Sequence, residues 1–187
     1  MREFLWLFLL APMAVAAESL ELGVEVGVPR SSSHAQVGSE RGRITWNRAS
    51  QMAAVASWHP GGDAWMGVAF EHLAFSRNDG FGQRVMLGDL RLGIESSDHE
   101  SAWRWSGCWQ IAGGWANDAE GGGGGGAWAL GARSAVDYRH GAHLLVGGWL
   151  SARWLAWQTE TDHLGASQKV EVSGFTPAVG LAIAWNW

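Results

Sequence analysis

The sequence predicts an all-β protein, an eight-stranded antiparallel up-and-down β-barrel that spans a membrane. Three features favour this fold class: apolar residues recur at every second position, turn-forming residues separate the apolar segments, and the last strand ends on an aromatic residue. In that strand, residues 175–187, one face carries bulky apolar side chains and the other carries mostly Ala, Gly, Thr and Asn. Such a strand fits a wall with lipid outside and a crowded interior.

Eight segments show this alternation. They cover residues 19–28, 46–58, 64–76, 83–95, 102–115, 127–138, 143–158 and 171–187. Most are longer than the about 9 to 11 residues that a tilted strand needs to cross a bilayer. An even number of strands is typical of bacterial outer-membrane barrels.

The connections between these segments alternate in length. Those at 59–63, 96–101 and 139–142 are short, whereas those at 29–45, 116–126 and 159–170 are long. Outer-membrane barrels have short periplasmic turns and longer external loops, so the pattern predicts the orientation as well as the fold. The connection at 77–82 is an exception, because it is short where a long loop is expected.

Residue identity predicts which face points outward. The polar phase of the strands consists mostly of Gly, Ala and isolated charges, which suits a narrow lumen, and the apolar phase carries large aliphatic and aromatic side chains suited to lipid. Trp65 and Trp149 fall on the polar phase, so either a bulge shifts the register there or these rings fill the lumen. Seven tryptophans near strand ends are predicted to anchor the barrel at the membrane interfaces. They are Trp46, Trp58, Trp103, Trp115, Trp154, Trp185 and Trp187.

The first 17 residues have the layout of a secretory signal peptide: a charged start, an apolar run, and small residues before Glu18. A membrane-spanning helix needs about 20 apolar residues, whereas this run is broken at Pro12. We therefore expect residues 1–17 to be cleaved during export and residues 18–187 to form a single barrel domain.

Composition argues against nucleic acid as a partner, against an intrachain disulfide and against a soluble barrel. The formal net charge of -5 argues against nucleic acid, which basic surfaces bind. Cys108 is the single cysteine, so an intrachain disulfide is excluded. The chain has 14 Trp and 27 Gly but a single lysine, Lys169. It therefore has few of the polar residues that cover the outside of a soluble barrel.

The leader, the eight strands, the alternating connections and the terminal aromatic strand resemble the small eight-stranded outer-membrane barrels of the OmpA and OmpX type. The resemblance is one of pattern and covers the whole mature chain. It implies a monomer in the outer membrane of a Gram-negative cell, with lipids and lipopolysaccharide as partners. It also implies that the barrel-assembly machinery recognises the C-terminal strand.

The polar phase of the strands collects charges of both signs. They are Glu21, Glu25, Glu71, Asp89, Arg91, Arg104, Arg133, Asp137 and Arg153. Because unpaired charges are costly in a low-dielectric interior, we expect a salt-bridge network that closes the lumen. A gated proton or ion path is the alternative interpretation.

Four arginines are predicted near the outer leaflet: Arg30, Arg41, Arg43 and Arg48. Guanidinium groups match phosphate oxygens, and the outer leaflet of such membranes is rich in phosphorylated glycolipid, so these residues are candidates for lipopolysaccharide contact. The alternative is a solvated loop whose charges bind nothing specific.

Signals for catalysis and for cofactors are weak. His99 and Ser101 have the spacing found in lipid A deacylases, but they fall in a predicted periplasmic turn. His140 and His143 are two ligands where metal sites usually need three or four, and no Gly-Lys-Ser or Gly-Lys-Thr follows the glycines at 121–126. We therefore expect no metal, cofactor or enzymatic activity.

The function predicted from the sequence is structural or surface-interactive: envelope integrity, lipopolysaccharide contact, or adhesion through external loops. The alternatives are an acyl hydrolase acting on lipid A, a narrow channel, and a soluble lipocalin-like carrier.

Overall fold

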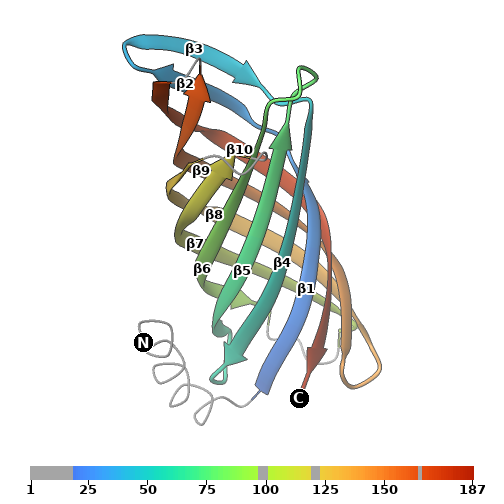
Figure 1. Cartoon of the computed structure of the whole chain (residues 1–187). Coiled ribbons are helices and arrows are strands. Elements are labelled where there is room, and N and C mark those ends of the chain that lie inside the picture. Colours follow the sequence, from blue (N-terminus) through green and yellow to red (C-terminus); the bar gives the residue numbers. More distant parts are fainter. Residues whose placement is uncertain (1–18, 97–100, 119–122, 164–165) are drawn as a thin grey trace.

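The computed structural model is a closed barrel of eight antiparallel strands with an additional hairpin at one end (Figure 1). It describes residues 19–96, 101–118, 123–163 and 166–187, so the predicted leader lies outside the described residues. The barrel strands are β1 (Ser19–Pro29), β4 (Arg48–His59), β5 (Ala64–Ser76), β6 (Gly82–Glu95), β7 (Trp103–Asp118), β8 (Gly124–His140), β9 (Leu144–His163) and β10 (Ala166–Asn186). Each neighbour pair is antiparallel, and β1 pairs with β10 to close the barrel, which confirms the predicted fold class.

No helix in the described part of the chain is long and apolar enough to cross a membrane.

The predicted loop at 29–45 is instead a hairpin of β2 (Ser32–Val37) and β3 (Glu40–Thr45). The chain of β1 continues into β2 along β10 without a change of register, since Pro29 pairs with Ala178 and Ser32 pairs with Phe175. β3 returns beside β2 and is the last strand of the sheet. We call this end of the barrel the hairpin end, and the opposite end, where β1 begins and β10 finishes, the terminal end (Figure 1).

The chain between β3 and β4 contains a register shift of one residue. Gly27 pairs with Gln51, but Ser32, five residues later, pairs with Thr45, six residues earlier. An extra residue on one strand is a β-bulge, and it moves the side chains that follow to the other face of the sheet. Trp46 therefore points into the barrel and is 8% exposed. The prediction that Trp46 anchors the outer wall is wrong for this reason.

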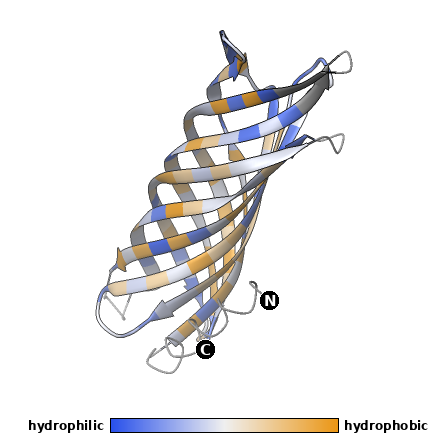
Figure 2. Cartoon of the chain, turned by 60° about the vertical axis from the view of Figure 1, so that its left-hand side comes forward, coloured by the Kyte–Doolittle hydropathy of each residue, from blue (hydrophilic) through white to orange (hydrophobic). Residues whose placement is uncertain are grey.

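The outer wall of the barrel is apolar, as predicted. The bulky residues of the alternating phase are exposed along the strands, and the hydropathy colours in Figure 2 alternate along the ribbon accordingly. Leu90, Leu92 and Ile94 of β6 are examples, and Asp89 and Arg91 between them are buried. This arrangement confirms that the large apolar side chains face outward and isolated charges face inward over this part of the barrel.

The strands are strongly staggered. Paired residues followed once round the barrel lead from Glu25 of β1 through Ala53, Glu71, Leu87, Gly114, Ala127, Trp157 and Val172 to Ala35 of β2. The row thus returns to its own strand ten residues nearer the hairpin end, from residue 25 to residue 35. For eight strands this stagger corresponds to a tilt of about 40°.

The stagger arranges most of the exposed aromatic residues in two girdles, with Phe70 and Trp109 exposed between them. With a rise of about 3.3 Å per residue and this tilt, Trp115, Trp128, Trp154 and Phe175 lie within about 5 Å of one height near the hairpin end. Trp103, Trp105, Tyr138, Trp185 and Trp187 form a second group near the terminal end, about 25 Å away along the axis. Two aromatic girdles about 25 Å apart match the apolar band of outer-membrane barrels.

Two other predicted anchors, Trp58 and Trp154, differ from the prediction in burial or in position along the strand. Trp58 pairs with Leu20 and Met66 but is 7% exposed, so it does not display its ring as an interface anchor does, and that assignment is corrected. Trp154 lies in the middle of β9 and not near a strand end, because β9 runs to His163 and not to residue 158 as predicted. Its height still places it in the girdle at the hairpin end, because the stagger displaces β9 along the axis.

The two tryptophans on the polar phase lie inside the barrel. Trp65 and Trp149 are buried, and the pairing around both is uninterrupted, so the rings fill the lumen without a bulge. The Trp149 ring fits against Gly27 and Gly180, where a side chain would collide with it. Its indole N–H donates to the Leu181 carbonyl oxygen at 3.3 Å.

The packing of Trp149 against Gly180 can be tested by the substitution Gly180→Ala, which adds one methyl group. A Cβ at position 180 would overlap the Val26 carbonyl oxygen and the indole, whereas a Cβ at Gly113 would meet nothing within 4 Å. We expect Gly180→Ala to destabilise the folded barrel by about 1 to 3 kcal/mol, the usual cost of overpacking. The control Gly113→Ala should change stability by less than about 0.5 kcal/mol. Urea unfolding midpoints of the refolded proteins measure both, and equal midpoints would contradict the packing described here.

Candidate functional site

The middle of the lumen is filled by a charged cluster around Arg91, which is 1% exposed. Its guanidinium donates to both carboxylate oxygens of Glu25, at 2.8 and 3.2 Å, and to Glu71 at 3.3 Å. Its Nε donates to Asp89 at 2.9 Å. One arginine therefore ties together carboxylates from β1, β5 and β6.

Two further arginines complete this central tier. Arg133 of β8 pairs with Glu25 at 2.7 Å, and its guanidinium lies 5.2 Å from the centre of the Trp149 ring. Arg153 of β9 donates to Glu71 at 2.6 Å. The charged side chains of the central tier therefore link five of the eight barrel strands, out of reach of the bilayer.

A second tier lies at the terminal end. Arg104 pairs with both oxygens of Glu21, with Asp137 at 3.1 Å and with Glu95 at 3.3 Å. His59 lies between the two glutamates, with Nδ1 3.1 Å from Glu95 and Nε2 3.5 Å from Glu21. All nine charged residues that the sequence assigns to the lumen thus belong to one tier or the other.

Several members of the tiers were not predicted. Glu95 and His59 end β6 and β4, and the inward phase of each strand includes them. Gln51 donates to Glu71 at 3.2 Å and Gln110 donates to Asp89 at 3.1 Å. The sequence could have indicated these four residues, because they occupy inward-facing positions of their strands and have polar side chains.

The hairpin end of the lumen is apolar, which the sequence analysis did not predict. Leu73, Phe75, Val85, Leu87, Leu155, Trp157, Val170 and Val172 are buried inside the barrel with Trp46. Trp46 lies 5.4 Å from Phe75 and 6.1 Å from Trp157, and Phe75 stacks on Trp157 at 5.3 Å, measured between ring centres. The expectation of glycines, alanines and ions throughout the interior is therefore corrected for this half.

The apolar layer also contains polar contacts. The Trp157 indole N–H donates to Gln83, and the Gln83 amide donates to the Thr159 hydroxyl at 2.7 Å. The inner face of the β2–β3 hairpin contributes Ala35, and Val37 and Ile44 pack against the layer. Together with Trp46, the hairpin thus extends the layer beyond the ends of β5 and β6.

These layers leave little free volume. A cavity of about 60 Å³ lies between the two charged tiers, which is room for a few water molecules. A wider pocket of about 300 Å³ opens at the terminal end, lined by residues that include His59, Arg104, Arg139 and Trp187. Side chains fill an eight-stranded barrel when they are this large, so the geometry favours a closed lumen.

The four arginines predicted to contact lipopolysaccharide are exposed, but they fall into two groups. Arg41 and Arg43 lie on β3, where Arg41 donates to Gln36 at 2.9 Å and Arg43 donates to Ser32 at 2.9 Å. Arg30 and Arg48 lie where β1 ends and β4 begins, and their side chains have no partner within the described residues. The structure therefore does not bring all four together.

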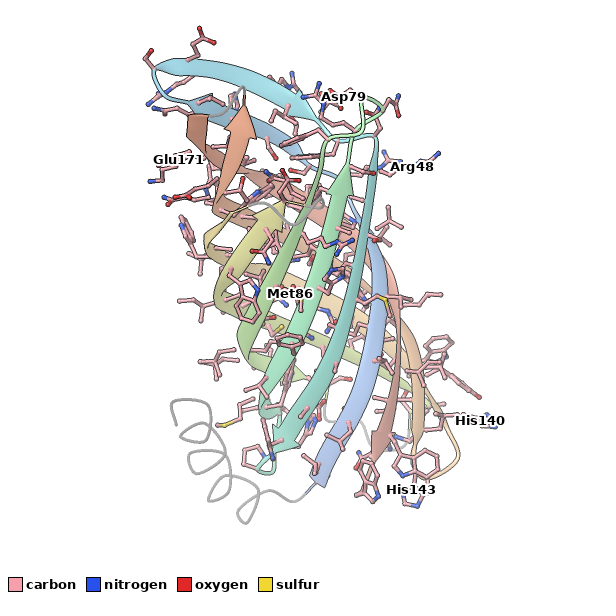
Figure 3. The ribbon with its side chains drawn as sticks, viewed as in Figure 1. Arg48, Asp79, Met86, His140, His143 and Glu171 are labelled. Atoms are coloured by element: carbon pink, nitrogen blue, oxygen red, sulfur yellow. The ribbon has the colours of Figure 1, made fainter. Side chains whose placement is uncertain are left out.

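The residues considered for catalysis or metal binding lie mainly at the terminal end. The Ser101 hydroxyl accepts from the backbone N–H of Trp103 at 3.1 Å, and His99 lies outside the described residues. His140 and His143 lie at the terminal end, far from Arg48 and Asp79 (Figure 3). His143 stacks on Trp185, and no group of three metal-ligating side chains occurs among the described residues.

Comparisons with known proteins find the same architecture. No protein-family model matches the sequence, and a comparison with curated proteins finds no match. The outer membrane protein OprG from Pseudomonas aeruginosa superposes with a TM-score of 0.65 at 12% identity, covering 92% of this chain and 96% of that one. Neisserial surface protein A (NspA) gives 0.55 at 9% identity, covering 88% and 96%. These likenesses show the fold, which is that of small outer-membrane β-barrels.

The contacts of the central tier predict that removing Arg91 strongly lowers the stability of the folded barrel. Arg91→Leu would leave Glu25, Glu71 and Asp89 buried without their main partner, and we expect a loss of about 3 to 5 kcal/mol of stability. Arg77, whose exposed pair with Asp79 at 2.8 Å lies in the β5–β6 connection, offers a matched control. Arg77→Leu should cost at most about 1 kcal/mol. Unfolding midpoints that fall equally in the two variants would show that the tier does not hold the barrel.

Proposed function

We propose that this protein is a non-enzymatic outer-membrane protein with a structural or surface-interaction role, and that it acts through its outer wall and its hairpin end. The observation that carries the proposal is the filled lumen. Two charged tiers and an aromatic layer occupy the inside along its length, which leaves the outside of the barrel as the surface available to partners.

Residence in the outer membrane is supported by the fold and by the two girdles. The apolar band between the girdles is about 25 Å tall, the height expected for a bacterial outer-membrane barrel. We place the hairpin end outside the cell, because β9, β10 and the β2–β3 hairpin extend beyond the girdle at that end, as the longer external parts of such barrels do. The barrel-assembly machinery would recognise β10, which leads to the exposed Trp187.

Among surface roles, contact with lipopolysaccharide has the most direct support. Arginines without side-chain partners within the described residues lie at the height of the girdle near the hairpin end, where lipid phosphates are expected. Envelope support and adhesion use the same surface. The lipid A hydrolase alternative has no comparable support, because Ser101 lies at the terminal end and donates no bond to a histidine in the described residues.

Fractionation tests the location. In a Gram-negative host expressing the full chain, we expect the protein in the outer-membrane fraction, extracted by detergent only, with a shift in gel mobility on heating. The physical reason is the exposed apolar wall, which water cannot solvate. Recovery from the periplasm without detergent would contradict the proposal and favour a lipocalin-like carrier.

Electrical recording tests the closed lumen. Refolded wild-type protein in planar bilayers is expected to show no stepwise conductance, because the Arg91 tier and the Trp46 layer fill the lumen. The heat-dependent mobility shift of the same preparation controls for folding. Reproducible single-channel steps from folded protein would contradict the proposal of a closed lumen and would favour a narrow channel.

A further inference from the structure

Three arginines lie on the outer wall at the hairpin end without a side-chain partner among the described residues. Arg30 follows β1, Arg48 begins β4 and Arg84 belongs to β6, and all three are exposed. Their side chains form no hydrogen bond or ion pair with any residue that the structure describes. Figure 3 shows Arg48 projecting away from the barrel at this end. We call these residues the arginine row.

The arginine row lies at one height. Each arginine is separated by ten residues of its own strand from a residue of the outward phase near the terminal end. The pairs are Arg30 with Leu20, Arg48 with Trp58, and Arg84 with Ile94. Ten residues of tilted strand climb about 25 Å, so the row lies at the upper edge of the apolar band. It is level within about 5 Å with the girdle of Trp115, Trp128, Trp154 and Phe175. Arginines at this height meet headgroups and not hydrocarbon.

Small residues separate Arg48 from Arg84. Arg48 pairs with Ser76 of β5, and Arg84 pairs with Ala74 of the same strand. Ala74 also pairs with Ser50. Two strand spacings, about 10 Å, lie between the arginines, and the side chains between them are short. A phosphate group that lies over these short side chains can be reached from both sides.

Two carboxylates at this end of the barrel are already engaged by other cations. Asp79 is engaged by Arg77 at 2.8 Å, and Glu171 pairs with Lys169 at 2.9 Å. The outward neighbour of Arg84 on β7 is Asn117, which carries no charge. A guanidinium without a protein partner at a lipid interface is suited to bidentate binding of phosphate.

We propose that Arg30, Arg48 and Arg84 form a binding site for the phosphate groups of a phosphorylated glycolipid in the outer leaflet. The site deepens the proposed function and rests on the hairpin end facing outward. Arg84 is a new member, whereas Arg41 and Arg43 belong to the hairpin and are already hydrogen-bonded through their Nε atoms.

Binding of lipid A to the refolded, detergent-solubilised barrel tests the site. Intrinsic tryptophan fluorescence or a spin-labelled lipid A reports the affinity. We expect the triple variant R30Q/R48Q/R84Q to bind at least about tenfold more weakly than wild type, since charge-assisted bonds are lost. Arg77→Gln, which removes a paired arginine at the same end, is the matched control and should bind as wild type does.

Two further arms identify the ligand. Wild-type protein should bind dephosphorylated lipid A as weakly as the triple variant binds lipid A itself, which also tests the site without any substitution. Phosphatidylglycerol should compete poorly; competition as strong as that of lipid A would overturn the assignment to a glycolipid. Equal affinity of wild type and triple variant for lipid A would overturn the site. Failure here is distinguishable from failure of the proposed function, because fractionation and conductance do not depend on these arginines.

Discussion

Closure of the backbone ladder between β1 and β10 is the constraint on which the rest of the structure depends. A closed barrel satisfies the backbone hydrogen bonds of its eight strands without an open edge, which is necessary in a lipid bilayer because hydrocarbon offers no hydrogen-bond partners. With eight strands and a stagger of ten residues, closure also fixes a narrow interior that side chains must fill. The outward phase then meets lipid, the inward phase must pack, and each residue's face follows from its register.

The interior meets this requirement in two different ways. In the middle and at the terminal end, arginines from β6, β7, β8 and β9 bind carboxylates from other strands, so charges are buried only in pairs. Toward the hairpin end, rings and aliphatic side chains replace the charges. Buried ion pairs add little net stability compared with apolar packing, but breaking one is costly, so the tiers specify the register of the strands.

The strands, the outward face and the charged residues of the lumen could be predicted from the sequence. Segments such as Leu90 to Ile94 alternate large apolar residues with polar or small ones, which is the period of a β-strand. The bulge at Trp46 could not be predicted, because a shift of one residue between two strands leaves no mark in either strand alone. The apolar layer was missed since Val85, Met86 and Leu87 are apolar on both phases, and the alternation disappears where a strand is buried on one side and lipid-covered on the other. His59 and Glu95 were missed because they lie at strand ends, where predicted boundaries are uncertain by a few residues.

The division between a filled interior and an outer wall determines where function can lie. Inside, nearly every charged group is committed to a neighbour from another strand, and releasing one would cost the barrel its stability. On the outer wall, Arg30, Arg48 and Arg84 lie at one height without side-chain partners among the described residues. Such charges persist on a lipid-facing wall when something outside the chain compensates them. The phosphate level of the outer leaflet is the part of the surroundings that supplies this compensation.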